Sequence, residues 1–366
     1  MNKNTKKLIL GVTGIRSEYD IMSSVYKSIQ EHKLLDLKLV VCGAHLSKTF
    51  GLTINEIKKD KFKIAARINN LKISKDPSSR LKGLAIQLDE LIYHVRRINP
   101  DFLLVLGDRE EAMNTALVGA YMNIPVAHIC GGDRVVGNVD DQVRHAVSKL
   151  AHLHFVTNIE SEKRLIKSGE QKFRVKNVGN PGLDRLLQEP TISDNVLSKK
   201  LNIKINKFEK FILVIQHTIS TEIDCSYDQM KITLQTLEKF KEKKIIVFPN
   251  SDPGSKEIIK AINQYKKEPN FYLIKNIPRT EFVNLLRRAS CLVGNSSAGI
   301  MEAPLIKLPV INVGNRQKGR LHSSNVQFVP HNKNLIDKAI RKAIYDKKYI
   351  KEVKKCFNPY GDGLSS

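Results

Sequence analysis

A short apolar run that stops at paired glycines constrains the fold of this chain more than any other feature. Residues 124–130 are apolar apart from one histidine, and the glycines at 131–132 follow directly, which is how a buried parallel strand ends in a turn. Beyond the turn, apolar residues recur at helical spacing from Val143, and Asp141 lies one helical turn before His145. This order predicts an α/β unit, in which ligands usually bind outside the carboxyl ends of the strands.

The same order of strand, turn and helix recurs along the chain. Apolar segments predict strands at 7–12, 37–43, 101–106, 124–130, 153–156 and 174–178, and then at 211–216, 245–248, 271–274, 291–293 and 310–313. A stretch rich in turn formers, and then in Lys and Asn, separates the two groups. We therefore expect an α/β protein with two Rossmann-like domains facing each other across a cleft: an N-terminal domain at 1–185, a linker at 186–208 and a C-terminal domain at 209–366.

The composition supports a two-domain protein of the cytoplasm. The length of 366 residues suits two domains, and 41% hydrophobic with 27% charged residues is typical of a soluble globular chain. No apolar run approaches the ~20 residues that span a bilayer, and basic residues lead straight into the first strand, so neither a membrane segment nor a signal peptide is expected. The five cysteines form no CxxC pair, which disfavours both a disulfide framework and a zinc site.

The formal net charge of +24 raises the question of nucleic-acid binding. The lysines are scattered over several segments, they lack interleaved aromatic residues, and the chain contains no Trp. Solvated lysine faces explain this pattern better than a nucleic-acid surface does, so no nucleic-acid partner is expected. A small anionic substrate would be attracted by the same charge.

Three aspartates stand where two neighbouring strands are expected to end. Asp108 is the first polar side chain after the strand at 101–106, Asp133 follows the strand at 124–130, and Asp141 begins the next helix. Carboxylates held close together shift each other's pKa and suit acid–base chemistry. These positions are therefore candidates for proton transfer.

Structural roles explain the same aspartates. Asp108 is also suited to cap the helix that starts at Glu110, and Asp133 to stabilise a turn. Asp140 and Asp141 favour the positive end of the helix dipole, and Asp140 is spaced to pair with Arg144 one turn later. The sequence leaves both interpretations open.

Several segments have the composition of phosphate sites. Arg16 follows a glycine turn between the first strand and its helix, although the turn is not a GxGxxG fingerprint. Near the C-terminus, Ser296 and Ser297 stand at a helix start with Glu302 on the second turn, and Arg316, Lys318 and Arg320 follow the next strand. Open backbone donors, hydroxyls and cations suit a phosphate, while helix capping by one serine is the structural alternative.

Six motifs in register make the chain similar to a known family. They are GVTGIRSEYD at Gly11, LGDREEA at Leu106, GGDRVVGNVDDQVRHAVSKLAHLHF at Gly131, FPNSDPGSKE at Phe248, GNSSAGIMEAP at Gly294 and GNRQKGR at Gly314. With them the chain resembles the UDP-N-acetylglucosamine 2-epimerases over nearly its whole length. It resembles most the hydrolysing branch, which releases N-acetylmannosamine for sialic acid synthesis.

The resemblance implies a fold, an assembly and a set of site residues. The fold is of the glycosyltransferase-B type, usually assembled as a homodimer or homotetramer, with a UDP-sugar as partner and with neither cofactor nor metal. The implied catalytic residues are Asp108, Asp133, Asp141 and His217. The residues implied to bind the UDP-sugar are Arg16, Asn250, Ser296, Ser297, Glu302 and Arg320.

The implied reaction converts UDP-N-acetylglucosamine and water into N-acetylmannosamine and UDP. A base removes the proton from the sugar carbon that bears the acetamide as UDP departs, and the resulting 2-acetamidoglucal is then hydrated. Asp133 stands where the family usually has Glu, and a shorter acid accommodates a bulkier sugar, so UDP-N,N'-diacetylbacillosamine on the legionaminic acid route is the alternative substrate. A glycosyltransferase of the same fold, which needs an acceptor sugar, is the alternative from another class.

Overall fold

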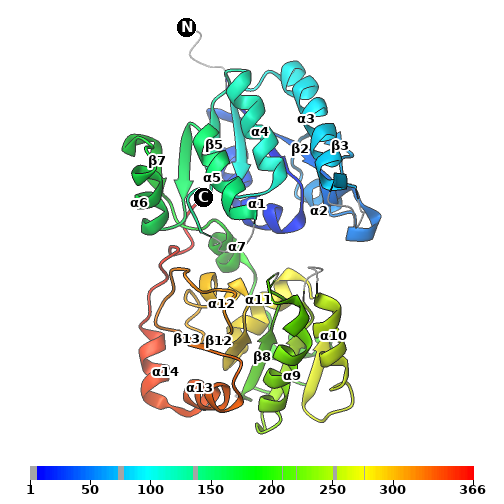
Figure 1. Ribbon diagram of the computed structural model, residues 1–366, viewed down its shortest axis with the longest axis vertical. Helices are drawn as coiled ribbons and strands as arrows, with labels where there is room; N and C mark the ends of the chain where they lie inside the picture. The colour runs from blue at the N-terminus through cyan, green and yellow to red at the C-terminus, as the bar shows by residue number, and fades with distance from the viewer. Residues whose placement is uncertain are drawn as a thin grey trace. The chain divides into compact units, whose positions relative to one another are not determined.

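The computed structural model describes residues 6–72, 78–134, 139–207, 209–219, 221–249, 254–275 and 277–366. The chain divides into two compact units. The first unit combines Met1–Arg185 with Tyr360–Ser366, and the second is Leu186–Pro359. Each unit is a parallel sheet with helices packed on it (Figure 1).

The first unit contains a seven-stranded sheet in the order β3-β2-β1-β4-β5-β6-β7, in which all described pairs are parallel. Its strands are β1 (Lys7–Thr13), β2 (Leu35–Cys42), β3 (Ile64–Ile68), β4 (Phe102–Leu106), β5 (Val126–Ile129), β6 (Leu153–Val156) and β7 (Val175–Asn177). Its helices are α1 (Arg16–Glu31), α2 (Ile54–Lys59), α3 (Ser78–Ile98), α4 (Glu110–Tyr121), α5 (Val139–Leu150), α6 (Ile159–Lys167) and α7 (Gly182–Gln188), the last of which crosses into the second unit.

Apolar strands place side chains on both faces of this sheet. In β4, Leu103 and Val105 join a core with α3, α4 and α5, whereas Leu104 and Leu106 join the opposite core with α1 and α2. Alternation along a strand that is apolar throughout requires two covering layers, because every second residue points to the other face. The carboxyl ends of β4 and β5 are left as neighbours on one edge of the sheet.

The second unit repeats this architecture with a six-stranded parallel sheet, in the order β10-β9-β8-β11-β12-β13. Its strands are β8 (Phe211–Ile215), β9 (Lys243–Val247), β10 (Phe271–Ile274), β11 (Cys291–Gly294), β12 (Val310–Val313) and β13 (Val326–Val329). Its helices are α8 (Asp194–Leu201), α9 (Ser226–Leu237), α10 (Ser255–Asn263), α11 (Arg279–Arg288), α12 (Ser297–Met301), α13 (Lys333–Tyr345) and α14 (Lys347–Lys354).

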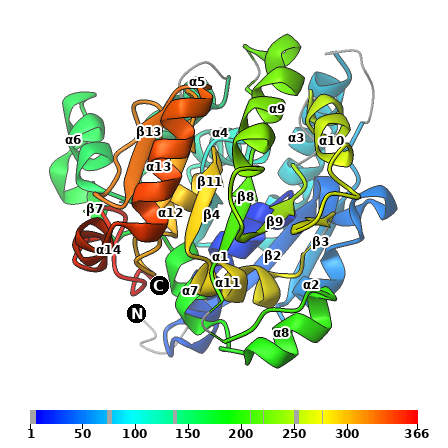
Figure 2. The same ribbon diagram turned by 90° about the horizontal axis from the view of Figure 1, so that it is seen from below.

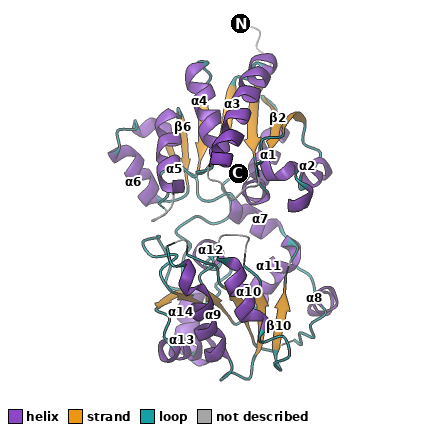
Figure 3. Ribbon diagram, turned by 45° about the vertical axis from the view of Figure 1, so that its right-hand side comes forward, coloured by secondary structure: helices purple, strands orange, loops and turns teal. Residues whose placement is uncertain are grey.

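Two apolar layers also cover the second sheet. One core holds side chains of α9, α10, α13 and α14, with α9 and α10 side by side (Figure 2). The other core holds side chains of α8 and α11. Figure 3 shows the strands of each unit enclosed between its own helices. Among the described residues, no helix is both long and apolar enough to cross a membrane.

The segment expected to be a linker contains ordered structure. Residues 186–208 include α8, whose Leu197 is fully buried, and Ile203 and Ile205 pack into the same core as β8. Burial of these apolar side chains attaches the segment to the second unit, although its Lys and Asn content had indicated a linker. The Lys and Asn side chains lie on the solvent side of α8 and in the exposed positions that follow this helix.

The last residues of the chain also differ from the expected division, because they return to the first unit. The backbone N–H of Asn180 donates to the backbone carbonyl of Tyr360 at 2.7 Å. The buried carboxylate of Asp184 accepts the backbone N–H of Ser365 at 3.0 Å and that of Ser366 at 2.7 Å. Bonds to an ionised acceptor are the stronger kind, so Asp184 is the anchor of the tail.

Replacing Asp184 with Ala should release residues 365–366 and lower the free energy of unfolding by about 1–3 kcal/mol, because two backbone donors lose a charged acceptor. Hydrogen exchange should show faster exchange of both amides. Asp362→Ala is the control, since exposed Asp362 accepts from the N–H of Leu364 within the tail. Unchanged exchange at 365–366 in Asp184→Ala would contradict the anchor.

Candidate functional site

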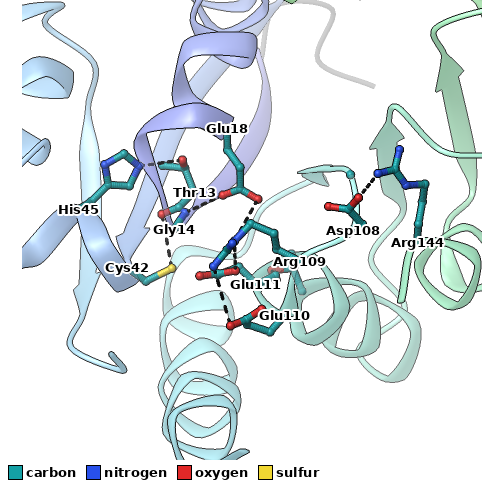
Figure 4. A network of polar contacts seen from close by, with 12 residues as sticks. Thr13, Gly14, Glu18, Cys42, His45, Asp108, Arg109, Glu110, Glu111 and Arg144 are labelled. Carbon is teal, nitrogen blue, oxygen red and sulfur yellow. Dashed lines mark hydrogen bonds and ion pairs between the residues drawn. The ribbon is translucent and has the colours of Figure 1, made fainter. Parts of the chain in front are cut away.

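In the first unit, one arginine joins the aspartates that follow two neighbouring strands. Arg144 of α5 pairs through Nη2 with Asp108 after β4, and its Nη1 lies 3.6 Å from the carboxylate of Asp133 after β5. Nη1 also donates to the carbonyl of Cys130 at 3.2 Å. Figure 4 shows Asp108 and Arg144 pointing toward each other. Asp108 and Asp133 are therefore brought together, as expected, and Arg144 is a member of the site that the sequence had suggested only as a partner of Asp140.

The carboxylate of Asp133 is held on one side by three donors. Its Oδ1 accepts from the hydroxyls of Thr157 at 2.7 Å and Ser161 at 2.5 Å, and from the amide of Asn158 at 3.2 Å. These donors lie at the end of β6 and in the start of α6. So many donors on one oxygen fix the side chain and stabilise its ionised form.

Asp141 lies on α5, three residues before Arg144. Its Oδ2 is 4.0 Å from Nε2 of His145, so the carboxylate faces the imidazole as the helical spacing predicted. The first turn of α5 holds both Asp140 and Asp141, which also agrees with the dipole interpretation. Helix α5 thus carries Asp141 and Arg144 at the same end of the sheet.

A buried cluster beside Asp108 was missing from the sequence predictions. Arg109 lies 3.3 Å from the carboxylate of Glu111, 3.8 Å from Glu110 and 4.0 Å from Glu18 of α1. Arg80 of α3 forms a two-point pair with Glu110. Figure 4 shows Glu18 of α1 and Glu110 and Glu111 of α4 converging on Arg109. Helical spacing gave no signal for the cluster, because α1 and α4 meet only in the folded sheet.

Gly14, at the end of β1, lies against this cluster. Its N–H donates to Glu18 Oε2 at 3.1 Å. A Cβ at this position would lie 2.1 Å from Glu111 Oε1, so no side chain fits unless Glu111 moves. The glycine of the turn before Arg16 therefore serves the close approach of two carboxyl groups.

Burial controls the protonation of this cluster. It raises the pKa of Glu18 to about 8, assisted by Glu111 and opposed by Arg109. Burial also raises the pKa of Glu111, against the effect of Arg109. Two buried carboxyl groups share one arginine, and a second ionised carboxylate is costly there. The cluster consequently retains a proton at neutral pH.

A neutral histidine supports the turn that carries Asp108. Nε2 of His128, in β5, is 2.7 Å from the carbonyl of Gly107, which only accepts, so Nε2 carries the proton. Nδ1 lies 3.2 Å from the hydroxyl of Ser148 on α5. Burial lowers the pKa of His128 to about 4, against the effect of the bond to Gly107. His128 thus links the Asp108 turn to the helix that holds Arg144.

In the second unit, a buried asparagine links three predicted site segments. The side chain of Asn295 accepts from the N–H of His217 at 2.7 Å and donates to the carbonyl of His217 at 2.9 Å. The backbone carbonyl of Asn295 accepts from Arg316 at 3.1 Å and from Gln317 at 2.9 Å. The segments after β8, β11 and β12 are thereby joined.

Two of the remaining predicted ligands of the second unit, Ser296 and Glu302, have structural partners as well. Ser296 caps α12 by accepting from the N–H of Ala298 at 3.3 Å, and half-buried Ser297 is the first residue of that short helix. Glu302 pairs with Arg279 of α11. Arg320 is half-buried beyond β12, and Asn250 lies outside the described residues.

Arg16, in the first unit, lies 3.4 Å from Glu56 and 3.9 Å from Asp20. Two acidic partners on one cation reduce the charge available to a phosphate in this arrangement. In the part of the chain that the structure describes, no group of three or more His, Cys, Asp or Glu side chains is placed to hold a metal ion.

Replacing Glu18 with Gln should remove a pH-dependent loss of stability. The folded-state pKa of Glu18 is raised to about 8 from an ordinary value of 4.5. The stability contributed by the protonated carboxyl is therefore complete below pH 4.5 and is lost as the pH rises to 8. Urea unfolding across this range should show Glu18→Gln gaining a few kcal/mol relative to the unchanged protein toward pH 8.

Glu110→Gln is the matched control of opposite sign. Burial raises the pKa of Glu110, but the hydrogen bond from Arg80 and the charge of Arg109 outweigh it, so the pKa lies below its usual value. The stability that ionised Glu110 contributes is therefore present when the pH is above the usual pKa of a glutamate, and it is lost in acid. Glu110→Gln should accordingly lower the free energy of unfolding at neutral pH. If Glu18→Gln followed the pH curve of the unchanged protein, the retained proton would be ruled out.

The comparisons with known proteins match the whole chain. The family model described as UDP-N-acetylglucosamine 2-epimerase matches residues 27–366. A UDP-N,N'-diacetylbacillosamine 2-epimerase (hydrolyzing) of Legionella pneumophila is 37% identical, over 98% of this chain and 93% of the relative. A GDP/UDP-N,N'-diacetylbacillosamine 2-epimerase (hydrolyzing) of Campylobacter jejuni is 33% identical, over 88% of this chain and 84% of the relative.

A solved structure supports the fold. The UDP-GlcNAc 2-epimerase of Neisseria meningitidis, bound to UDP-GlcNAc, superposes with a TM-score of 0.84 at 20% identity, over 98% of this chain and 97% of that chain. The predicted fold class, two Rossmann-like α/β domains of the glycosyltransferase-B type, is confirmed. Because the family model and both relatives span most of its length, the chain belongs to the UDP-N-acetylglucosamine 2-epimerase family, in the hydrolysing branch.

Proposed function

We propose that the chain is a hydrolysing 2-epimerase whose substrate is UDP-N,N'-diacetylbacillosamine. The observation that supports this substrate is the activity for which the two relatives at 37% and 33% identity are named. UDP-N-acetylglucosamine, which the sequence analysis preferred, is the second candidate, favoured by the description of the family model. Both substrates undergo the same reaction at the second sugar carbon.

The reaction is an elimination followed by a hydration. A base takes the proton from the second carbon, the bond from the first carbon to the diphosphate oxygen breaks, and UDP departs. Water then adds its hydroxyl to the first carbon of the glycal and a proton to the second carbon on the opposite face, which gives the free 2-epimer. Atoms and electrons balance without a redox cofactor, so none is proposed.

Asp108 is the group best suited to proton transfer. Arg144 holds its Oδ2, whereas its Oδ1 has no hydrogen bond or ion pair among the described residues. A carboxylate that is oriented through one oxygen and open at the other can reach a substrate proton. Asp141 is the second proposed acid–base group, and Asp133, with its three donors, orients Arg144 and the sugar.

Asp133 also supports the bulkier substrate. The donors at Thr157, Asn158 and Ser161 draw its carboxylate toward β6 and α6. The side chain is one methylene shorter than the usual glutamate, so more space remains for an acetamido group on the sugar. We propose His217, Ser296, Ser297, Glu302 and Arg320, with Asn250 and Arg16, for the UDP moiety.

The deciding experiment offers each nucleotide sugar alone in deuterated water and follows products by proton NMR and UDP release. UDP-N,N'-diacetylbacillosamine should give UDP and a free sugar with deuterium at the second carbon, with kcat/KM about tenfold or more above that for UDP-N-acetylglucosamine. Asp108→Asn should lower kcat about 100-fold or more, the usual contribution of a positioned acid–base group.

Asp101→Asn is the matched control for Asp108→Asn. Asp101 lies just before β4, and its carboxylate accepts from Lys7 and from the N–H of Leu8. The Asp101→Asn variant should keep kcat within about twofold of the value for the unchanged protein. Nucleotide sugar that stays intact until an acceptor is added would indicate a glycosyltransferase instead. Equal or reversed kcat/KM values would refute the substrate assignment alone.

We also propose a homodimer or homotetramer that forms through helices α3 and α4 of the first unit. These packed helices expose Leu81, Tyr93 and Tyr121, the last 82% exposed. From residue 112 to residue 132 the chain has no Lys, Arg, Asp or Glu. Two copies that each carry a charge of +24 repel each other, so the uncharged end of α4, where Tyr121 is exposed, is the part of this surface where they can approach.

Tyr121→Glu should therefore reduce the molar mass in solution by half or more, because each copy would bring a charge into the contact. Light scattering after size exclusion measures the change. Phe173→Glu, at another exposed aromatic of the first unit, is the control and should leave the mass unchanged. A monomeric unchanged protein would refute the assembly without affecting the proposed activity.

A further inference from the structure

One fully buried residue connects the loops that carry the proposed nucleotide ligands. Asn295 follows β11, which lies between β8 and β12 in the sheet. Its side chain bonds both the N–H and the carbonyl of His217 after β8, and its own carbonyl accepts from the side chains of Arg316 and Gln317 after β12. Side-chain and main-chain groups of one residue thus join three neighbouring strand ends.

The chemistry at this position requires an amide. The N–H of His217 needs an acceptor and its carbonyl needs a donor, and the side chain of asparagine presents both at the required spacing. Asp would keep the acceptor but place a second oxygen against the carbonyl of His217. Ala would leave two backbone groups without these partners in a site where Asn295 itself is 0% exposed.

Backbone bonds reinforce the same junction. The N–H of Asn295 donates to the carbonyl of Ile215 at 3.1 Å, which extends the pairing of β11 with β8. At Gly294, with φ of +130°, a Cβ would lie 2.0 Å from the carbonyl of Ile215. The segments that follow β8 and β11 therefore stay bonded to each other as far as His217 and Asn295, and they diverge beyond these two residues.

We propose that Asn295 is a positioning residue, which orients the side chains of His217 and Arg316 toward the diphosphate of the substrate. This inference rests on the proposed function. Asn295 acts through its neighbours: it fixes the main chain on both sides of the His217 side chain, and it holds the guanidinium of Arg316 beside the serines at the start of α12. Because these loops are already fixed before the substrate binds, no conformational entropy has to be lost to order them during turnover.

Asn325 provides a matched control. It is also 0% exposed, and its side chain donates to the carbonyl of Leu308 at 2.8 Å. It lies just before β13, at the amino ends of the strands and thus at the opposite edge from His217. Asn325→Ala removes a similar buried amide without touching the three loops.

The experiment compares Asn295→Ala, Asn325→Ala, His217→Ala and the double variant Asn295→Ala/His217→Ala. Each is checked for folding by circular dichroism and for turnover of UDP-N,N'-diacetylbacillosamine. Asn295→Ala should lower kcat about tenfold or more, and Asn325→Ala less than about twofold, although both lower the unfolding temperature. In the His217→Ala background, Asn295→Ala should lower kcat by less than about threefold, because the side chain of His217 is gone and Ala keeps the main-chain carbonyl that holds Arg316.

Two results would overturn the inference: equal losses of kcat in Asn295→Ala and Asn325→Ala, or a full tenfold loss from Asn295→Ala in the His217→Ala background. If Asn295→Ala does not fold, Asn295→Asp takes its place, since it keeps the size and the acceptor, and the same comparison decides. If the unchanged protein turns over neither nucleotide sugar, the proposed function fails first. Calorimetric titration with UDP alone then still tests Asn295, whose replacement by Ala should weaken binding about tenfold.

Discussion

The structure depends on one constraint of parallel sheets: all strands of a sheet end on the same edge. Polar loops then crowd together where no further strand is available to satisfy their backbone groups. In this protein, buried side chains take over that task. His128 bonds the carbonyl before Asp108, Asn295 bonds both backbone groups of His217, and Asp184 bonds the amides of the returning tail. The residues that fix the loops are thus distinct from those proposed to meet the substrate.

Two arginines of the first unit each face more than one carboxylate. Arg144 is buried and lies between Asp108 and Asp133. Arg109, whose side chain is 33% exposed, faces Glu18, Glu110 and Glu111, and of these Glu18 and Glu111 are buried. Burial makes three ionised carboxylates too costly there, so the excess is neutralised by a proton.

Much of the fold could be predicted from the sequence, because apolar strands such as 102–106 and 211–215 stand out from their polar surroundings. Strands β3 and β13 and helices α8, α13 and α14 were not predicted. Lysines on the solvent faces of these three helices obscure the apolar stripe that packs inward. Of the proposed site, the positions of Asp108 and Asp133 at adjacent strand ends followed from the pattern alone. Arg144, His128 and Asn295 depend on contacts between distant segments, which spacing along one helix or strand does not reveal.

The cluster around Arg109 has a consequence for how this sequence can change over evolutionary time. Two arginines and three glutamates, with one bound proton, sum to zero charge in a space where the absence of a Cβ on Gly14 is also required. A side chain at Gly14 brings a steric clash, and loss of one charged member leaves an unbalanced charge, so compensating pairs are the accessible route at the charged positions. Protonated Glu18 is the exception, because a neutral Gln keeps the charge sum at zero. Positions 80, 109, 110 and 111 should therefore covary among descendants of this chain, as a unit inherited together.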